Sequence, residues 1–159
     1  MAEDEQDWFD PSPFVVDSRK LIEVFGEWPS FDDAALISLV LDRDDGSPWN
    51  PDSNSPTLSM TVRFAETGYY LSEIRFNRVC NLELTGLSHQ NEFQEIVFDQ
   101  LPARVDSRGS FTPAGISAEI IAHCGLHGRF EFQSGIVLSI VPCDEDGHAE
   151  LSDDGDHPL

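Results

Sequence analysis

The amino-acid sequence predicts an α+β fold dominated by a mostly antiparallel β-sheet. Several segments alternate apolar and polar residues with the period of two that is typical of half-buried strands. Helical periodicity is clear only near the N-terminus, and strands do not alternate with helices as they would in a parallel sheet. We therefore expect about six to eight strands, in a sandwich or a half-open barrel, with one or two short helices.

The chain has 159 residues, a length that suits one domain. Its two ends are acidic, since segments 1–10 and 144–159 contain neither Lys nor Arg. Runs of like charge are usually solvated. We expect an acidic N-terminal tail at 1–11, a globular domain at 12–143 and an acidic C-terminal tail at 144–159.

The first expected element is a short helix in "DSRKLIEVFG", residues 17–26. Asp17 or Ser18 is expected to cap its start, and Gly26 supplies the left-handed residue that commonly ends a helix. Pro29 bars any continuation of the helix. The apolar stripe of this helix consists of Leu21, Ile22 and Phe25.

The stretch "FGEWPSFDDAAL", residues 25–36, follows the helix. We expect Trp28 and Phe31 to fold back over the apolar stripe while Pro29 stiffens the corner. Asp32 or Asp33 would then accept hydrogen bonds from backbone donors of the turn. On this interpretation the stretch is a structural corner; contact of Asp32 or Asp33 with a partner is the alternative.

The strands follow this corner. Residues 35–43 carry apolar side chains on both faces, which predicts a central strand. Residues 57–64 alternate cleanly, with Leu58, Met60, Val62 and Phe64 directed inward. Segment 92–101 is expected as either a strand or a short helix. Further strands are expected at 80–86, 116–124, 128–133 and 135–142.

The charge is the strongest feature of the composition: 30 acidic residues against 9 basic ones give a net charge of −21. Such a field repels nucleic acids and anionic membrane surfaces, and it attracts basic proteins. General solvation or adaptation to high salt explains the same acidity. Partner-directed charge and general solvation therefore both remain open at this point.

Three cysteines and the character of the N-terminus bear on localisation. An odd number of cysteines without a dense framework favours a reduced, cytoplasmic setting. The segment "MAEDEQDWFD" lacks the apolar core of a signal peptide, and no apolar run approaches the roughly 20 residues of a membrane span. We expect a cytoplasmic protein without membrane contact.

Motifs that carry catalysis or bind metal are weak. "HCGLH" offers His123, Cys124 and His127 as zinc ligands, with Cys80, His89 or Cys143 to complete the set. Consecutive residues of a strand point to opposite faces, which argues against such a site. Sequence signatures of nucleophilic enzymes and of phosphate-binding loops are absent. We assign no catalytic residue, metal or cofactor.

Three segments resemble the immunity protein 50 family of bacterial polymorphic-toxin systems. The most specific is "LIEVFGEWPSFDDAALISLVLDR", which is similar to a family phrase close to F-G-x-W-P-S-F-H-D-A-E followed by an apolar strand. "LSEIRFNRVCNLELTGLSHQNEFQEIVFD" and "FEFQSGIVLSIVP" match later segments in the same order. The resemblance covers residues 20–142. Asp32 stands where the family pattern has His, and Ala35 where it has Glu.

The resemblance implies a small non-enzymatic protein that binds and neutralises a cognate toxin. An acidic neutraliser suits a basic, nuclease-like toxin domain, because its carboxylates occupy the cleft in place of phosphates. The protein is expected as a monomer or weak dimer. The candidate partner-binding residues are Asp32, Asp33, Asp42, Asp44, Asp45, Trp49 and Asp52.

Two other functions remain as alternatives. One is a small enzyme of unrecognised type, with a site built from His89, Asn91 and scattered acids. The other is an acidic, salt-adapted adaptor module without a toxin partner. An enzyme predicts a concave pocket with ionisable groups, whereas an inhibitor predicts acids gathered on one face.

Overall fold

The computed structural model describes residues 9–42, 56–88 and 90–149. The helical elements are the 3-10 turn η2 (Ser12–Phe14) and the helix α1 (Arg19–Phe25). The strands are β1 (Val15–Val16), β2 (Ala35–Asp42), β3 (Thr57–Phe64), β4 (Tyr70–Asn77), β5 (Cys80–Thr85), β6 (Glu92–Leu101), β7 (Arg104–Val105), β8 (Phe111–Thr112), β9 (Gly115–Cys124), β10 (His127–Phe132) and β11 (Ser134–Pro142).

Nine of these strands form one sheet, in the order β1-β11-β4-β3-β2-β6-β9-β10-β5. Its pairings are antiparallel except for β1 with β11, which are parallel with Val15 opposite Gly135. The strands β7 and β8 form a separate hairpin. The prediction of a mostly antiparallel sheet with little helix is confirmed. The expected number of strands was too low, because β1, β4 and the small hairpin were not recognised.

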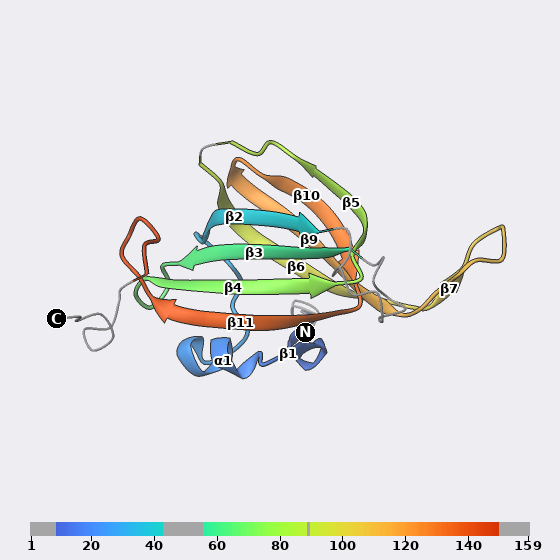
Figure 1. The fold of residues 1–159 in the computed structure, drawn as a ribbon, viewed down its shortest axis with the longest axis horizontal. Coiled ribbons are helices and arrows are strands. Elements are labelled where there is room, and N and C mark those ends of the chain that lie inside the picture. The colour runs from blue at the N-terminus through green and yellow to red at the C-terminus, as the bar shows by residue number, and fades with distance from the viewer. Residues whose placement is uncertain (1–8, 43–55, 89, 150–159) are drawn as a thin grey trace, which may run out of the picture.

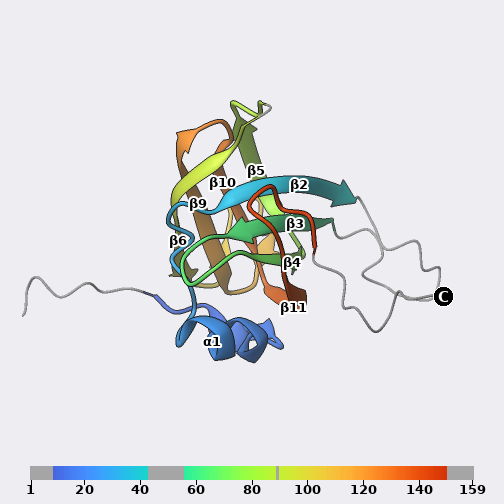
Figure 2. The same ribbon diagram turned by 90° about the vertical axis from the view of Figure 1, so that its left-hand side faces the viewer.

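The sheet folds over on itself into two layers (Figures 1 and 2). One layer contains β11, β4, β3 and β2, and the other contains β6, β9, β10 and β5. The rings of the core cross between the layers: Phe76 on β4 lies 5.2 Å from Phe130 and 4.7 Å from Phe132, both on β10. The layers join where β2 meets β6, and β1 and β5 end the sheet.

The predicted helix is present and lies along β11 (Figure 1). Ser18 occupies the N-cap position, but its hydroxyl donates to the carbonyl of Ser12 at 3.1 Å instead of capping the helix. Gly26 ends the helix with a φ of 87°, as expected, and its N–H donates to Ile22. Leu21 is fully buried and fixes the helix to the core.

The corner after the helix packs onto the strands. Phe31 is 1% exposed. The centroid of its ring lies 5.1–6.4 Å from the ring centroids of Phe64, Phe93 and Phe98. Trp28 is half-buried and contacts Phe31 and Phe98 at 6.1 and 5.8 Å. Both rings belong to the same core cluster as Leu21 and Phe25 of the helical stripe. Their aromatic contacts are with each other and with phenylalanines of β3 and β6, and the expected packing over the stripe stays a prediction.

The segment predicted as a central strand is β2, the fifth of nine in the sheet order. Its expected burial on both faces is wrong: Ile37, Val40 and Leu41 are 45%, 50% and 51% exposed. The reason is that β2 pairs with β3 along its length but with β6 only at Ala35 and Glu92. Beyond that position the two layers diverge, and β2 forms a rim.

Two further predictions are resolved by the burial of side chains. In β3, Leu58, Met60, Val62 and Phe64 are at most 1% exposed, which confirms the alternation. The ambiguous segment 92–101 is the strand β6, which pairs with β9 along its length. Phe93, Ile96 and Phe98 of β6 are buried.

Residues on both sides of the expected 12–143 body contact it. Phe9 packs against the core, and Pro11 is buried. After β11, Cys143 is 3% exposed and forms an isolated bridge with Ala149. Arg63 of β3 donates to the carbonyl of Glu145, and Gly147 lies against Ile37. The described residues up to Ala149 therefore contribute to the packing of the domain.

We predict that Phe31→Ala destabilises the protein by about 3–5 kcal/mol, because it empties a fully enclosed aromatic site. The matched control is Phe111→Ala in the β7–β8 hairpin, where the ring is 65% exposed; its effect should stay within about 0.5 kcal/mol. Urea denaturation of both variants measures the difference. Equal destabilisation by the two substitutions would contradict the role given to Phe31.

Candidate partner-binding surface

The backbone of the corner holds Asp32 and Asp33 outward. The N–H of Asp32 donates to the Ser30 hydroxyl at 3.2 Å, and the N–H of Asp33 donates to the Phe93 carbonyl at 3.0 Å. The turn closes with the N–H of Ala34 on the Phe31 carbonyl. These donors therefore use a hydroxyl and carbonyls, and the expectation that an aspartate carboxylate would satisfy them was wrong. Both aspartates are exposed.

Two residues of the corner have left-handed backbones: φ is 71° at Phe31 and 63° at Asp33. This conformation is uncommon for a bulky side chain and costs about 1–2 kcal/mol. Burial of the Phe31 ring offsets that cost, since enclosing a phenylalanine contributes about 1.5–3 kcal/mol. The direction of the two carboxylates thus follows from the packing of the Phe31 ring against β3 and β6.

His123 joins the aspartates from the end of β9. Its Nε2 lies 3.5 Å from Oδ1 of Asp33. The side chains of Asp32, Asp33 and His123 each bring one ligand atom within 4.8 Å of the others. All three are exposed, and exposed acids commonly gather without a metal, so we assign no ion to this group. We call Asp32, Asp33 and His123 the acidic corner.

The structure does not unite the predicted binding residues. Asp42 ends β2, whereas the acidic corner lies at the start of that strand. The strand spans eight residues, so about 25 Å separates the two positions. Asp44, Asp45, Trp49 and Asp52 lie outside the described residues. The acidic corner and Asp42 are therefore two separate positions along one strand.

The residues considered for zinc have different neighbours. His123 contacts Asp33, whereas Nε2 of His127 lies 3.0 Å from the Thr85 hydroxyl. Cys80 donates weakly to Glu131 at 3.7 Å. A second acidic group, Asp144, Asp146 and His148, is an exposed turn in which the Asp144 carboxylate accepts two backbone N–H groups. We assign no metal to this turn either.

Asn91, named in the enzyme alternative, fixes a loop. Its Oδ1 accepts hydrogen bonds from the N–H groups of Ser88 and Leu126, at 3.0 and 2.9 Å. Its Nδ2 donates to the Ser88 carbonyl at 2.8 Å. These bonds tie the segment before β6 to the turn between β9 and β10. His89, its suggested partner, lies outside the described residues.

A buried carboxylate lies in the second layer. Glu131 of β10 stands between Phe130 and Phe132, so alternation along the strand directs its side chain to the face away from these two rings. It is nevertheless only 8% exposed. Its Oε1 accepts hydrogen bonds from Arg104 and from Asn81, the latter at 3.1 Å. Arg129 lies 3.8 Å from its Oε2. We call these four side chains the Glu131 network; it joins β5, β7 and β10.

The network determines how Glu131 titrates. Burial alone would raise the pKa of its carboxyl group, but hydrogen bonds from Arg104 and Asn81 and the charge of Arg104 lower the pKa below its usual value. Partial burial, the charge of Glu131 and the hydrogen bond to it raise the pKa of Cys80. A raised pKa makes the Cys80 thiol a poorer nucleophile at neutral pH.

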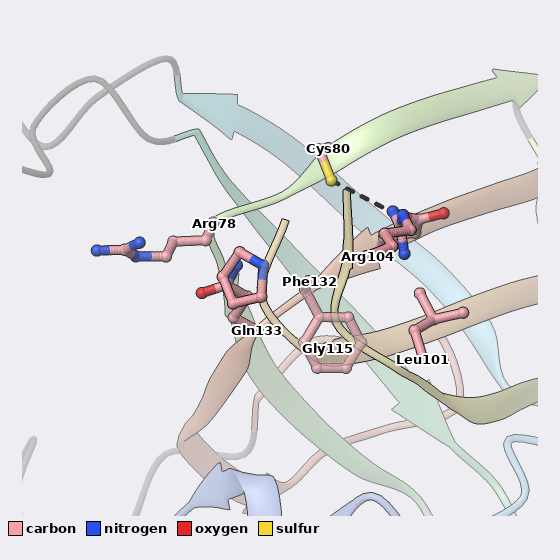
Figure 3. Close-up of a pocket in the computed structure, with 9 residues that line it drawn as sticks. Arg78, Cys80, Leu101, Arg104, Gly115, Phe132 and Gln133 are labelled. Carbon is pink, nitrogen blue, oxygen red and sulfur yellow. Dashed lines mark hydrogen bonds and ion pairs between the residues drawn. The ribbon is translucent and has the colours of Figure 1, made fainter. Parts of the chain in front are cut away.

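The hollow beside this network is small (Figure 3). Its volume is about 10 Å³, room for about one water molecule. Its lining includes Cys80, Arg104, Glu131 and Phe132. A wider, shallow groove lies between α1 and β11, and its lining includes Lys20 and Glu23.

Sequence reasoning missed His123 as a neighbour of Asp33 and missed the Glu131 network. Both depend on contacts between residues far apart in the chain, such as Arg104 with Glu131. The one usable signal was Glu131 itself, since a glutamate between two phenylalanines in "RFEFQ" invites the question of its environment. The sequence offered no cue to its partner.

We predict that the Glu131 network stabilises the fold fully above pH 4.5 and loses this contribution progressively as the pH falls below that value. Because the folded pKa lies below the usual value of 4.5, the ionised form favours folding, and this contribution disappears as the pH falls through the folded pKa. The wild type should therefore exceed Glu131→Gln in unfolding free energy at neutral pH, and the gap should narrow on acidification. Chemical denaturation across this pH range measures it. Glu66→Gln, at an exposed turn, should show no such trend.

Comparisons with known proteins add no assignment to this geometry. None of the described helices is long and apolar enough to cross a membrane. A functional conclusion therefore depends on three features of the structure itself: the acidic corner, the rim strand β2 and the Glu131 network. No family model, curated protein or solved structure matches the chain.

Proposed function

We propose that this protein is a non-enzymatic immunity protein that binds and neutralises a cognate toxin domain through an acidic surface centred on the acidic corner. The observation that carries the proposal is the exposed pair Asp32–Asp33 on a backbone anchored by a buried ring. Because the backbone is fixed, the two carboxylates are pre-organised for a cationic partner. Pre-organisation reduces the entropy lost on binding.

The charge of the chain supports the choice of partner. With a net charge of −21, the protein attracts basic surfaces at long range and speeds their encounter. A nuclease-like toxin has a basic cleft that receives phosphates, and adjacent carboxylates present a similar density of negative charge. The proposed partner is therefore a basic toxin domain whose cleft the protein covers.

The resemblance to the immunity protein 50 family supports the same conclusion and adds one distinction. Asp32 stands where the family pattern has His, so this chain carries an additional negative charge at the exposed corner. His123, supplied by β9, places an imidazole beside Asp33. A partner with a more basic contact patch would suit this arrangement.

Growth rescue tests the proposed function. The C-terminal domain of the protein encoded immediately upstream is expressed with and without this chain, and binding is measured with the purified pair. We expect toxicity that this chain relieves, and nanomolar binding that weakens as salt increases. A harmless neighbour that does not bind would contradict the immunity function and return attention to the enzyme and salt-adapted alternatives.

A double variant tests the acidic corner. Asp32→Asn with Asp33→Asn keeps the shape, and asparagine tolerates the left-handed backbone at position 33. We expect the association rate with the upstream domain to fall about three- to tenfold at low salt, and the difference to shrink at high salt. Stopped-flow fluorescence measures both rates.

The control removes the same charge elsewhere. Asp17→Asn with Glu23→Gln alters exposed residues at α1, whose ion pairs with Lys20 and Arg19 contribute little to stability. An equal loss of rate in both double variants would mean that only the net charge matters. That outcome would reject the corner as the centre of the surface.

A further inference from the structure

Within the part of the chain that the structure describes, the rim strand β2 has one paired edge and one open edge. It pairs with β3 from Ala35 opposite Arg63 to Asp42 opposite Thr57. On its other side it meets β6 at a single position, Ala35 opposite Glu92. No backbone hydrogen bond from the described residues reaches this outer edge after Leu36. Figure 1 shows β2 as the upper border of its layer.

The ladder identifies which groups face outward. The N–H of Leu36 donates to Asn91 and the carbonyl of Ala34 accepts from Phe93, so Ala35 directs its own groups to β3. Ile37 is the extra residue of a bulge, and pairing resumes with Ser38 opposite Thr61. Because β3 keeps a regular register with β4, alternation assigns the outward N–H and C=O groups to Leu39 and Leu41.

Apolar side chains accompany these backbone groups. Leu41 stands opposite Leu58 and therefore points to the same, inner face, yet Leu41 is 51% exposed while Leu58 is 0% exposed. Val40, on the outer face, is 50% exposed. Between Ile37 and Leu41 the strand carries no charged residue and no proline, the usual protections of an edge. An added strand would cover these side chains and satisfy the ladder.

The charges on the segments beside the outer edge of β2 indicate which kind of added strand would bind there. Neither 30–42 nor 92–101, the segments that border it, contains Lys or Arg. Acidic residues lie on both, at Asp32, Asp33, Asp42, Glu92, Glu95 and Asp99. A second copy of this chain would bring the same charges against them. A segment with lysine or arginine at alternate positions would place bases beside these acids.

We propose that the outer edge of β2, residues 38–42, accepts an extended basic segment of the partner protein as an additional strand. Main-chain hydrogen bonds to Leu39 and Leu41 supply the register, and the acids on either side select a basic sequence. The inference rests on the proposed function and specifies how the partner is held. It places the acidic corner at one end of the bound segment and Asp42 at the other.

A synthetic peptide probes the edge without any toxin. A labelled peptide of about six residues that alternates Lys and Val has the length of a typical strand. We expect it to bind, and to shift the amide NMR signals of residues 38–42. The control peptide carries N-methyl groups on alternate residues. These groups keep the charge of the peptide but remove the backbone N–H donors that would face β2. Equal binding by the two peptides would overturn strand addition in favour of unspecific ionic attraction.

Two variants of one residue separate the backbone from the side chain. Leu41→Pro removes the outward N–H, and Leu41→Ala shortens the same half-exposed side chain but keeps that N–H. We expect Leu41→Pro to weaken binding of the peptide about tenfold more than Leu41→Ala does. Melting curves of both variants check that each is folded, and equal affinities would overturn the proposal.

The same variants distinguish this inference from the proposed function. If the upstream domain binds the wild type and Leu41→Pro equally well, the edge is not used, although the immunity function stands. If that domain does not bind at all, the immunity function fails, and peptide binding still decides the capacity of the edge. Slow hydrogen exchange at Leu39 and Leu41 in the free protein, or a dimer abolished by Leu41→Pro, would show another occupant and overturn the proposal.

Discussion

The enclosure of one aromatic ring determines the arrangement around it. Phe31 adopts a left-handed backbone that a bulky residue normally avoids, and contacts with rings of β3 and β6 hold it there. The same turn sends the chain from the helix into β2 and ties Asp33 to the backbone of Phe93. The meeting of the two layers and the direction of the neighbouring carboxylates are consequences of that single packing arrangement.

The junction also explains why one strand is both central and exposed. β2 stands in the middle of the sheet order, yet it shares only one paired position with β6. In a sheet of nine strands that stayed regular throughout, a central strand would be paired along both of its edges. Here the sheet folds where β2 meets β6, so both layers contribute to the core. Beyond that point β2 forms the rim of its layer, beside the acidic corner. Stability and accessibility are thus provided by opposite ends of one strand.

The sequence predicted what depends on local pattern. The helix ending at Gly26 and the inward set of β3 followed from periodicity and from glycine, and both are present. The exposure of Leu41 was not predictable, because it depends on which strand becomes the neighbour of β2 and where the two diverge. For the same reason, the contact of His123 with Asp33 and the contact of Arg104 with Glu131 could not be predicted from the local sequence around these residues. The immunity function remains a prediction from charge and resemblance.

The pairing of β1 with β11 constrains how the protein is made. Val15 lies opposite Gly135, and Gly135 also lies opposite Phe76 of β4, so β11 is the bridge between the N-terminal strand and the rest of its layer. During translation β1 cannot pair with β11 until nearly the whole domain has left the ribosome. Pairings between residues so distant in the chain slow folding and leave strand edges open to other chains. The high density of negative charge keeps nascent chains apart during that interval.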